Sequence, residues 1–365
     1  MSIKCGIVGL PNVGKSSLFN ALSDAGAEAA NFPFCTIDPN VGVVPVPDER
    51  LEKLNELVQP AQKQPTAIEF VDIAGLVKGA SEGKGKGNAF LSHIREVDII
   101  IHMVRCFEDD DVVHVEGGVD PIRDIQIIES ELILKDLESI EKREEKLRKQ
   151  AKSGDKSIQA KTDRIVKLRE HLEEGNPART FQRNGQDDAW VDLMLLSDKD
   201  VLYVCNVDEG DLPYGENNEH AQKVAAHAAG QGTEYVVVCA KIESEIAELD
   251  DEEKSSFLEE LGLEKSGLDR LIQAAYKKLG LITFYTAGPK EVRAWAIPEG
   301  IKAPQAAGTI HSDFERGFIR AETIKYEDYI ECGSEAAARE QGKMRSEGRD
   351  YVVKDGDVLL FRFNV

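Results

Sequence analysis

The sequence lacks a Cys-x-x-Cys pair, an apolar run long enough to span a bilayer, and any excess of positive charge. Its six cysteines are scattered, which predicts reduced thiols in the core of a cytoplasmic protein. Because no run could cross a membrane and an apolar strand follows residues 1–4 directly, we expect neither a membrane span nor a signal peptide. The formal net charge of −22 argues against general coating by nucleic acid, DNA included, and against an anionic membrane partner.

What the chain does contain is enough apolar material for substantial cores, since 41% of its 365 residues are hydrophobic. This length favours two or three domains. Short apolar segments that read as strands alternate with helical patterns; they lie at 3–8, 41–46, 67–71, 99–104, 200–205 and 235–238. The alternation predicts an α/β fold with a doubly wound, mostly parallel sheet that binds its ligands at the carboxyl ends of the strands.

A glycine-rich segment, GLPNVGKS at residues 9–16, joins the first apolar strand to a segment with a helical pattern. Strand, glycine loop and helix are the context that a phosphate-binding loop requires, which argues against a chance match. Gly9 and Gly14 would let backbone N–H groups turn toward a phosphate, and the helix N-terminus would add partial positive charge. Lys15 would reach the β- and γ-phosphates of a nucleotide, and the Ser16 hydroxyl would bind Mg²⁺.

Two further loops supply candidate parts of a nucleotide switch. Thr36 lies in a turn-rich segment, where its hydroxyl could complete the Mg²⁺ shell; an ordinary turn residue is the alternative. Asp72 follows a strand and could hold a Mg²⁺-bound water, and the Gly75 N–H could contact the γ-phosphate. An Asp-x-x-Gly pattern alone says little, but at this distance behind a phosphate loop it supports the same site.

The segment expected to contact the base departs from the Asn-Lys-x-Asp of GTPases, because residues 206–209 read Asn-Val-Asp-Glu. Glu209 is one methylene longer than the aspartate that accepts two hydrogen bonds from guanine, and Val207 replaces the lysine. Guanine specificity should therefore be weakened. The Asn206 amide could still pair with N6 and N7 of adenine. We infer a preference for adenine. Ala240, in the tripeptide after the last strand of this sheet, is a further candidate for nucleotide contact.

Hydrolysis needs a group that orients water, and the position after Asp-x-x-Gly is occupied by Leu76 instead of the glutamine of Ras-type proteins. An aliphatic side chain cannot orient a nucleophilic water, so the polar group must come from elsewhere. His114, in an irregular loop after a strand, is the candidate, and a purely structural histidine is the alternative. His102 lies within an apolar run and is expected in the core.

A long helical stretch after Pro121 carries a heptad seam, which predicts an antiparallel, coiled-coil-like hairpin inserted in the nucleotide-binding domain. The seam is formed by Ile133, Leu137, Ile140, Leu147 and Ala151, with Ile158, Ile165, Leu168 and Leu172 on the returning arm. Between Lys142 and Arg169 the hairpin has eleven Lys/Arg against four Asp/Glu. This basic tip suits a phosphate-rich partner such as RNA; a solvated coiled-coil surface is the alternative.

Near Gly280 the pattern changes to short strands with glycine or proline turns, which predicts a small α+β domain up to residue 365. The expected organisation is a nucleotide-binding domain at 1–280, interrupted by the helical hairpin at 125–195, followed by the C-terminal domain at 281–365.

The residues together resemble one family. GLPNVGKSSLFNAL, NFPFCTIDPN, DIAGLVKGASEGKGKGNAFLSHIREVD and the Asn-x-x-Glu segment are similar to the Obg-like ATPases, the YchF family of translation-factor-class P-loop proteins. The resemblance runs through the whole chain and implies a TGS-like C-terminal domain. It also implies a cytosolic, Mg²⁺-dependent ATPase that associates with ribosomes.

Carried to this sequence, the resemblance implies phosphate contacts, Mg²⁺ ligands and base contacts at defined positions. They are Asn12, Val13, Gly14, Lys15, Ser16 and Ser17 for the phosphates, Ser16 and Thr36 for Mg²⁺, and Asn206 and Val207 for the base. Asn12 also matches the asparagine that coordinates K⁺ in potassium-stimulated relatives. Two alternatives stay open: a GTPase of the same fold that binds guanine through Asn206 and Glu209, and a ribosome-binding adaptor whose hydrolysis is vestigial.

Overall fold

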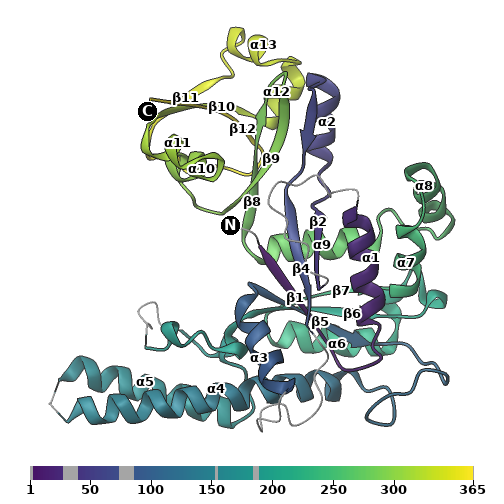
Figure 1. Cartoon of the computed structure of the whole chain (residues 1–365), viewed down its shortest axis with the longest axis vertical. Helices are drawn as coiled ribbons and strands as arrows, with labels where there is room; N and C mark the ends of the chain where they lie inside the picture. The colour runs from purple at the N-terminus through teal and green to yellow at the C-terminus, as the bar shows by residue number, and fades with distance from the viewer. Residues whose placement is uncertain (1–2, 28–39, 74–85, 153–154, 184–188, 365) are drawn as a thin grey trace. The chain divides into compact units, whose positions relative to one another are not determined.

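The protein is described by a computed structural model that covers residues 3–27, 40–73, 86–152, 155–183 and 189–364 (Figure 1). The chain divides into two compact units. The first contains residues 1–44 and 69–275, and the second contains residues 45–68 and 276–365. The expected division kept residues 45–68 in the nucleotide-binding domain. In the structure the apolar face of a helix in this segment packs with residues of the C-terminal part, which explains the difference.

The first unit is built on a six-stranded sheet in the order β2-β4-β1-β5-β6-β7. The strands are β1 (Lys4–Val8), β2 (Val41–Pro45), β4 (Ala67–Asp72), β5 (Ile99–Arg105), β6 (Asp200–Asn206) and β7 (Glu234–Val238). From β4 through β7 all pairs are parallel, which confirms the mostly parallel sheet. Because Ile7 is paired with Asp72 and Arg105 with Asn206, the carboxyl ends of these strands meet at one edge.

The helices of the first unit lie between these strands or follow the last of them, β7. They are α1 (Lys15–Ala27), α3 (Lys86–Glu96), α4 (Pro121–Ala151), α5 (Lys156–Glu173), α6 (Glu219–Gly230), α7 (Ala240–Ala247), α8 (Asp251–Glu260) and α9 (Gly267–Lys278). Short 3₁₀ turns are η2 (Ala178–Thr180), η3 (Val191–Leu193), η4 (Leu196–Asp198), η5 (Glu209–Asp211) and η6 (Gly215–Asn217). Local sequence sets several helix starts. For example, Asp120 caps α4 through the Arg123 N–H at 3.1 Å, and Pro121 occupies its first turn.

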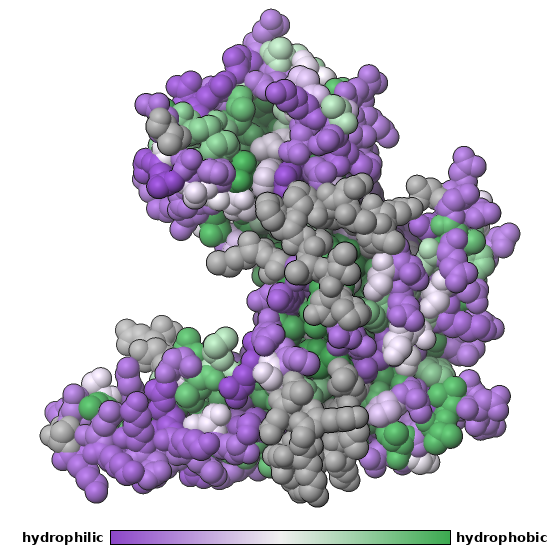
Figure 2. Space-filling view, in the orientation of Figure 1, coloured by the Kyte–Doolittle hydropathy of each residue, from purple (hydrophilic) through white to green (hydrophobic). Residues whose placement is uncertain are grey.

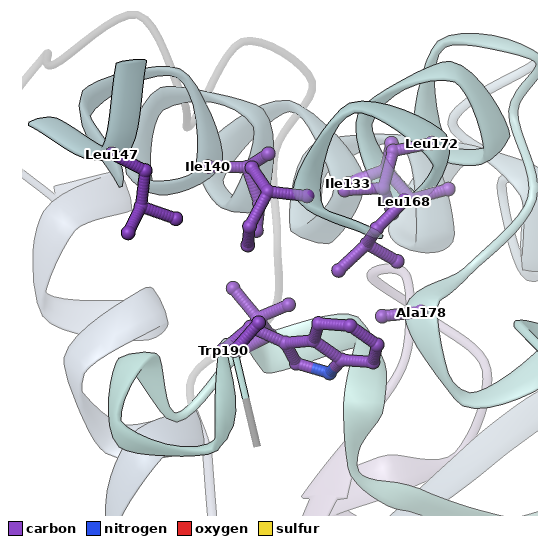
Figure 3. Close-up of a cluster of buried hydrophobic side chains, with 10 residues drawn as sticks. Ile133, Ile140, Leu147, Leu168, Leu172, Ala178 and Trp190 are labelled. Carbon is purple, nitrogen blue, oxygen red and sulfur yellow. The ribbon is translucent and has the colours of Figure 1, made fainter. Parts of the chain in front are cut away.

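The predicted helical hairpin is present as the long pair α4 and α5, which lie side by side (Figure 1). Its seam residues Ile140, Ile165 and Leu168 are fully buried, and Trp190, from the segment after the hairpin, packs against the same cluster (Figure 3). Glu144 fills the polar position of the seam on α4 and accepts hydrogen bonds from Arg148 on α4 and Arg169 on α5. We call α4, α5 and the described segments 177–183 and 189–198, which contribute to the same cluster, the helical arm.

The second unit holds a mixed six-stranded sheet in the order β11-β10-β12-β8-β9-β3. Its elements are α2 (Glu49–Val58), β3 (Gln62–Gln64), β8 (Leu281–Ala287), β9 (Glu291–Pro298), α10 (Ala303–Ile310), α11 (Ser312–Arg316), β10 (Phe318–Lys325), α12 (Tyr326–Cys332), α13 (Glu335–Glu340), β11 (Arg345–Glu347) and β12 (Asp357–Phe363). Neighbours on β8 point to opposite faces: Phe284 packs with α10, and Tyr285 packs with Leu51 and Leu54 of α2. The expected second C-terminal domain is therefore confirmed as a mixed-sheet unit.

The apolar segments and the cysteines of the sequence can be located in the structure. Within the described ranges, no helix has the length and apolarity needed to cross a membrane. Cys5, Cys106, Cys205 and Cys239 are buried as free thiols, as expected for core cysteines, and Cys332 is half-buried. Cys35 lies outside the described residues. Burial raises the pKa of Cys5 further above its usual value, so this thiol stays protonated at neutral pH.

Candidate functional site

The glycine-rich loop runs from the end of β1 to the start of α1, as the sequence predicts. A Cβ atom at Gly9 would lie 2.7 Å from the carbonyl oxygen of Met103, so the loop can pass the end of β5 only with glycine. Gly14 has a φ of +95°, a conformation that residues with side chains rarely adopt, and Asn12 has a φ of +63°. Helix α1 begins at Lys15, so its free N–H groups lie at the loop.

Lys15 and Asp72 meet at the carboxyl edge of the sheet. The Lys15 Nζ atom lies 3.2 Å from Asp72 Oδ1, with the two side chains 11% and 23% exposed. This pairing places a carboxylate from β4 beside the first turn of α1, which carries Ser16. A hydroxyl and a nearby carboxylate fit Mg²⁺, which is commonly held by one or two protein oxygens together with substrate phosphates and water. Among the described residues, no group of three or more His, Cys, Asp and Glu could hold a metal by itself.

Asn206, at the end of β6, joins the phosphate loop to the start of α7. Its Nδ2 donates to the Val13 carbonyl at 2.9 Å, and its Oδ1 accepts the Ala240 N–H at 2.9 Å. The residue is 5% exposed. Sequence reasoning assigned this amide to adenine; in the structure both of its polar atoms already bond backbone groups, and the adenine pairing stays a prediction. Asn206 therefore positions three loops of the site.

The residues after Asn206 form the wall where GTPases read guanine. Asp208 accepts the Gly210 N–H at 3.0 Å and so caps η5. Glu209 extends from this turn, and its Oε2 lies 2.6 Å from the Nζ of Lys241 on α7. The hydrogen bond that Lys241 donates to Glu209 raises the pKa of Lys241. The carboxylate in the guanine-reading position is thus paired within the chain.

These segments enclose one pocket of about 890 Å³, which is in the range of small-molecule sites. Among the residues predicted for the site, those that line it are Asn12, Gly14, Lys15, Ser16, Ser17, Asn206, Val207, Glu209 and Ala240. Val13 is buried beneath the loop and contributes its carbonyl to Asn206. Asp72 reaches the pocket through Lys15. Thr36, Gly75 and Leu76 lie outside the described residues.

Sequence reasoning singled out His114 in the loop that follows β5 but not the residues of this loop that line the pocket. Phe107, Asp109 and Val112 line the pocket, and buried Arg105 shapes this loop from behind. The Arg105 guanidinium donates to the carbonyls of Phe107 at 3.1 Å, Asp109 at 3.1 Å and Val112 at 2.8 Å. The only sequence signal was a charged residue at the end of an apolar strand, which does not indicate a partner.

His114 lies in the same loop but is not among the residues that line the pocket. Its Nε2 lies 2.8 Å from Asp124 Oδ2 on α4, and its Nδ1 accepts the Glu116 N–H at 3.1 Å. The side chains of His114 and Asp124 are 5% and 3% exposed. The predicted catalytic role of His114 therefore stays a prediction. His102, expected in the core, is buried.

A strand, a glycine loop and a helix that present Lys15 and Ser16 to a pocket at the carboxyl edge of a parallel sheet define a P-loop nucleotide-binding protein. A family model described as "50S ribosome-binding GTPase" matches residues 4–147. A second, YchF-GTPase_C, described as "Protein of unknown function (DUF933)", matches residues 281–364.

Relatives match the whole chain. The "Ribosome-binding ATPase YchF" of Bacillus subtilis (strain 168) is 58% identical, and that of Escherichia coli O157:H7 is 55% identical, each over 100% of both chains. A solved structure, "Structure of the Schizosaccharomyces pombe YchF GTPase", is 39% identical with a TM-score of 0.89, covering 99% of this chain and 98% of its own. This chain belongs to the YchF family, which confirms the resemblance found in its motifs.

Proposed function

We propose that this chain is a Mg²⁺-dependent ATPase that hydrolyses ATP in the pocket beside the phosphate loop and acts as a nucleotide-dependent switch on ribosomes in the cytoplasm. The observation that carries the proposal is the pocket itself, which is lined by Lys15 and Ser16 together with Val207, Glu209 and Ala240. The bacterial relatives are named as ribosome-binding ATPases. A phosphate-binding end and a base-sized opposite wall are the two parts that a nucleotide requires.

In this proposal each predicted site residue has a distinct task. Lys15 binds the phosphates and balances their negative charge. Before nucleotide binds, the Asp72 carboxylate partly neutralises the Lys15 ammonium group. The Ser16 and Thr36 hydroxyls would bind Mg²⁺ directly, and Asp72 would bind it through a water. The ion would neutralise negative charge at the transferred phosphoryl group. Asn12 is the proposed K⁺ ligand beside the phosphates, where a cation could take the place of an arginine finger. His114 is the proposed water-orienting group, assisted by the Gly75 N–H on the γ-phosphate.

The pairing of Glu209 with Lys241 favours adenine over guanine. Guanine recognition needs a carboxylate free to accept two hydrogen bonds. Glu209 has the longer side chain, and its carboxylate is paired with Lys241. Loss of a bidentate contact costs about 1–3 kcal/mol of discrimination, which favours ATP over GTP. The names of the relatives differ on this point, because the bacterial proteins are called ATPases and the fission yeast protein is called a GTPase.

Competition between ATP and GTP for the purified protein tests the preference. We expect ATP to displace a fluorescent nucleotide at roughly tenfold lower concentration than GTP. Clear preference for GTP would favour the alternative, a GTPase of the same fold. Lys15→Ala removes the phosphate contact and should abolish hydrolysis, whereas Lys223→Ala on exposed α6 is the matched control. Full activity in Lys15→Ala would show that the measured hydrolysis comes from a contaminant.

A second alternative, a ribosome-binding adaptor with vestigial hydrolysis, is favoured by one observation: His114 is turned to Asp124 and away from the pocket lining. Single-turnover hydrolysis of ATP, with and without ribosomes, separates it from the switch. We expect ribosomes to raise the rate. A rate that stays near the uncatalysed one under both conditions would favour the adaptor.

For ribosome association we propose the helical arm and the TGS-like second unit as the contacting surfaces. The arm shows a hydrophilic surface in Figure 2, and exposed lysines on it include Lys142, Lys146 and Lys167. Part of its positive charge is paired internally, since Arg148 and Lys149 bond Glu144 and Glu145. The exposed lysines are therefore the better candidates for rRNA phosphates.

The matched experiment compares two double charge reversals. Lys146→Glu with Lys167→Glu should lower co-sedimentation with ribosomes at low salt by roughly tenfold and leave ATP affinity intact. Arg95→Glu with Lys223→Glu makes the same change in net charge on exposed positions of α3 and α6, outside both the arm and the second unit. Equal loss in both variants would mean that net charge, and not the arm, drives association.

A further inference from the structure

The loop that carries His114 is fastened to three different parts of the first unit. Arg105 holds the Val112 carbonyl at 2.8 Å, and the Asn12 Nδ2 donates to the Val113 carbonyl at 3.0 Å. Asp124 then holds the His114 ring at 2.8 Å. The first two fastenings come from the strand end and the phosphate loop. The third comes from α4, which is the long helix of the arm.

The hydrogen bonds of His114 define where its one proton lies. Nδ1 accepts the Glu116 N–H at 3.1 Å, and Arg123 Nη2 lies 3.5 Å from it, so this nitrogen carries no hydrogen. Nε2 must then carry the hydrogen and donate it to Asp124. Both nitrogens are occupied, and the ring is 5% exposed. In this position neither nitrogen can bond a water in the nucleotide pocket.

Asp124 belongs to a rigid element that reaches far from the pocket. Helix α4 has 31 residues and is therefore about 46 Å long. Two more buried carboxylates fix it along its length. Glu129 accepts from Tyr203 on β6 at 2.9 Å, and Asp136 accepts from the Leu196 and Ser197 N–H groups at 2.8 and 2.7 Å. Because α4 is one continuous helix, a displacement that tilts it about these anchors would also move Asp124.

We propose that Asp124 is a catch that holds His114 away from the nucleotide pocket, and that displacement of α4 by a partner on the arm opens it. Asp124 is a positioning residue, since it acts only through His114. The inference rests on the proposed function, because it takes His114 as the water-orienting group. It adds how basal hydrolysis is kept low and how binding at the arm reaches the pocket.

Asp124→Asn tests the catch, because it keeps the size of the side chain and turns a charge-assisted hydrogen bond into a neutral one. Two quantities are measured on the full chain without ribosomes: kcat for ATP hydrolysis, and hydrogen exchange of the Glu116 amide, which the His114 ring protects. We expect both to rise roughly three- to tenfold. Asp110→Asn, an exposed charge change in the same loop, should alter neither.

Faster exchange with an unchanged or lower kcat would overturn the catch, since a loosened His114 would then not promote hydrolysis. Unchanged exchange would overturn it as well. Two more variants, His114→Ala and the double variant His114→Ala with Asp124→Asn, distinguish failure of the catch from failure of the proposed function. If His114→Ala leaves kcat unchanged, the catalytic assignment itself fails. If it lowers kcat and also abolishes the gain from Asp124→Asn, the catch acts through His114. Should Asp124→Asn fold poorly, Asp124→Glu displaces the carboxylate by one methylene and supplies the same comparison.

Discussion

Replacing Arg105 by lysine should release the loop that forms one wall of the nucleotide pocket, because it removes hydrogen bonds to this loop while keeping the positive charge. The guanidinium is 2% exposed and bonds three carbonyls of the loop that contributes Phe107, Asp109 and Val112 to the pocket. It also lies 4.5 Å from the centroid of the Phe107 ring. An ammonium group lacks the planar fork that serves several acceptors at fixed angles, so Arg105→Lys should leave two carbonyls without their donors.

Phe107 and Val112 are half-buried and Asp109 is exposed, so each carbonyl that loses its donor costs about 1 kcal/mol, the lower bound for a buried group. Two of them at the lower bound give about 2 kcal/mol, or roughly a 30-fold weaker Kd, if nucleotide binding requires the loop in its present form. Titration of ATP against the variant, followed by calorimetry, measures this change. Arg143→Lys, which alters an arginine on the arm, is the control. Unchanged ATP affinity in Arg105→Lys would refute the idea that Arg105 holds this wall.

Three other predictions concern stability and specificity. Burial lowers the pKa of His102 to about 4 from 6.5, so the unfolded chain takes up the proton at higher pH; the free energy of unfolding should fall by about 3 kcal/mol between pH 6.5 and 4. In urea unfolding, the free energy of unfolding should fall less between pH 6.5 and 4 for His102→Leu than for the exposed control His93→Leu. Trp190→Ala empties the centre of the arm cluster and should cost about 3–5 kcal/mol in denaturant unfolding, with ATP affinity retained. Glu209→Asp should narrow the ATP-to-GTP affinity ratio by roughly tenfold in nucleotide competition, and an unchanged ratio would contradict the role given to Glu209.

Features encoded in short range were predictable from the sequence. The phosphate loop needs only glycines at fixed spacing between a strand and a helix, and Gly14 and Lys15 lie where this spacing places them. The helical arm follows from heptad spacing, which alone places Ile140 and Leu168 in its core. The heptad spacing also locates Glu144 as a polar residue at a seam position of α4, although it does not predict the hydrogen bond from Arg169 on α5.

Features that depend on distant partners could not be predicted. Asn206 was found as a site residue, but its bonds to Val13 and Ala240 exist only once three loops meet. Arg105 looked like the end of a strand, and its carbonyl partners carry no side-chain signal. His114 and Asp124 are ten positions apart across an irregular loop, so no periodicity relates them. The packing of residues 45–68 with the second unit likewise depends on contacts far apart in the sequence.

The two tryptophans give the molecule an optical probe in each unit. Trp190 lies in the core of the arm cluster, where its Nε1 has no hydrogen-bond partner within the described part of the chain, so its emission should be blue-shifted. Trp295 belongs to the second unit, stacked 6.2 Å from Phe284 and bonded to the Thr286 hydroxyl at 3.0 Å. With Trp295→Phe, fluorescence would follow the arm alone. A nucleotide-induced change in Trp190 emission would then reveal communication between the pocket and the arm in unlabelled protein.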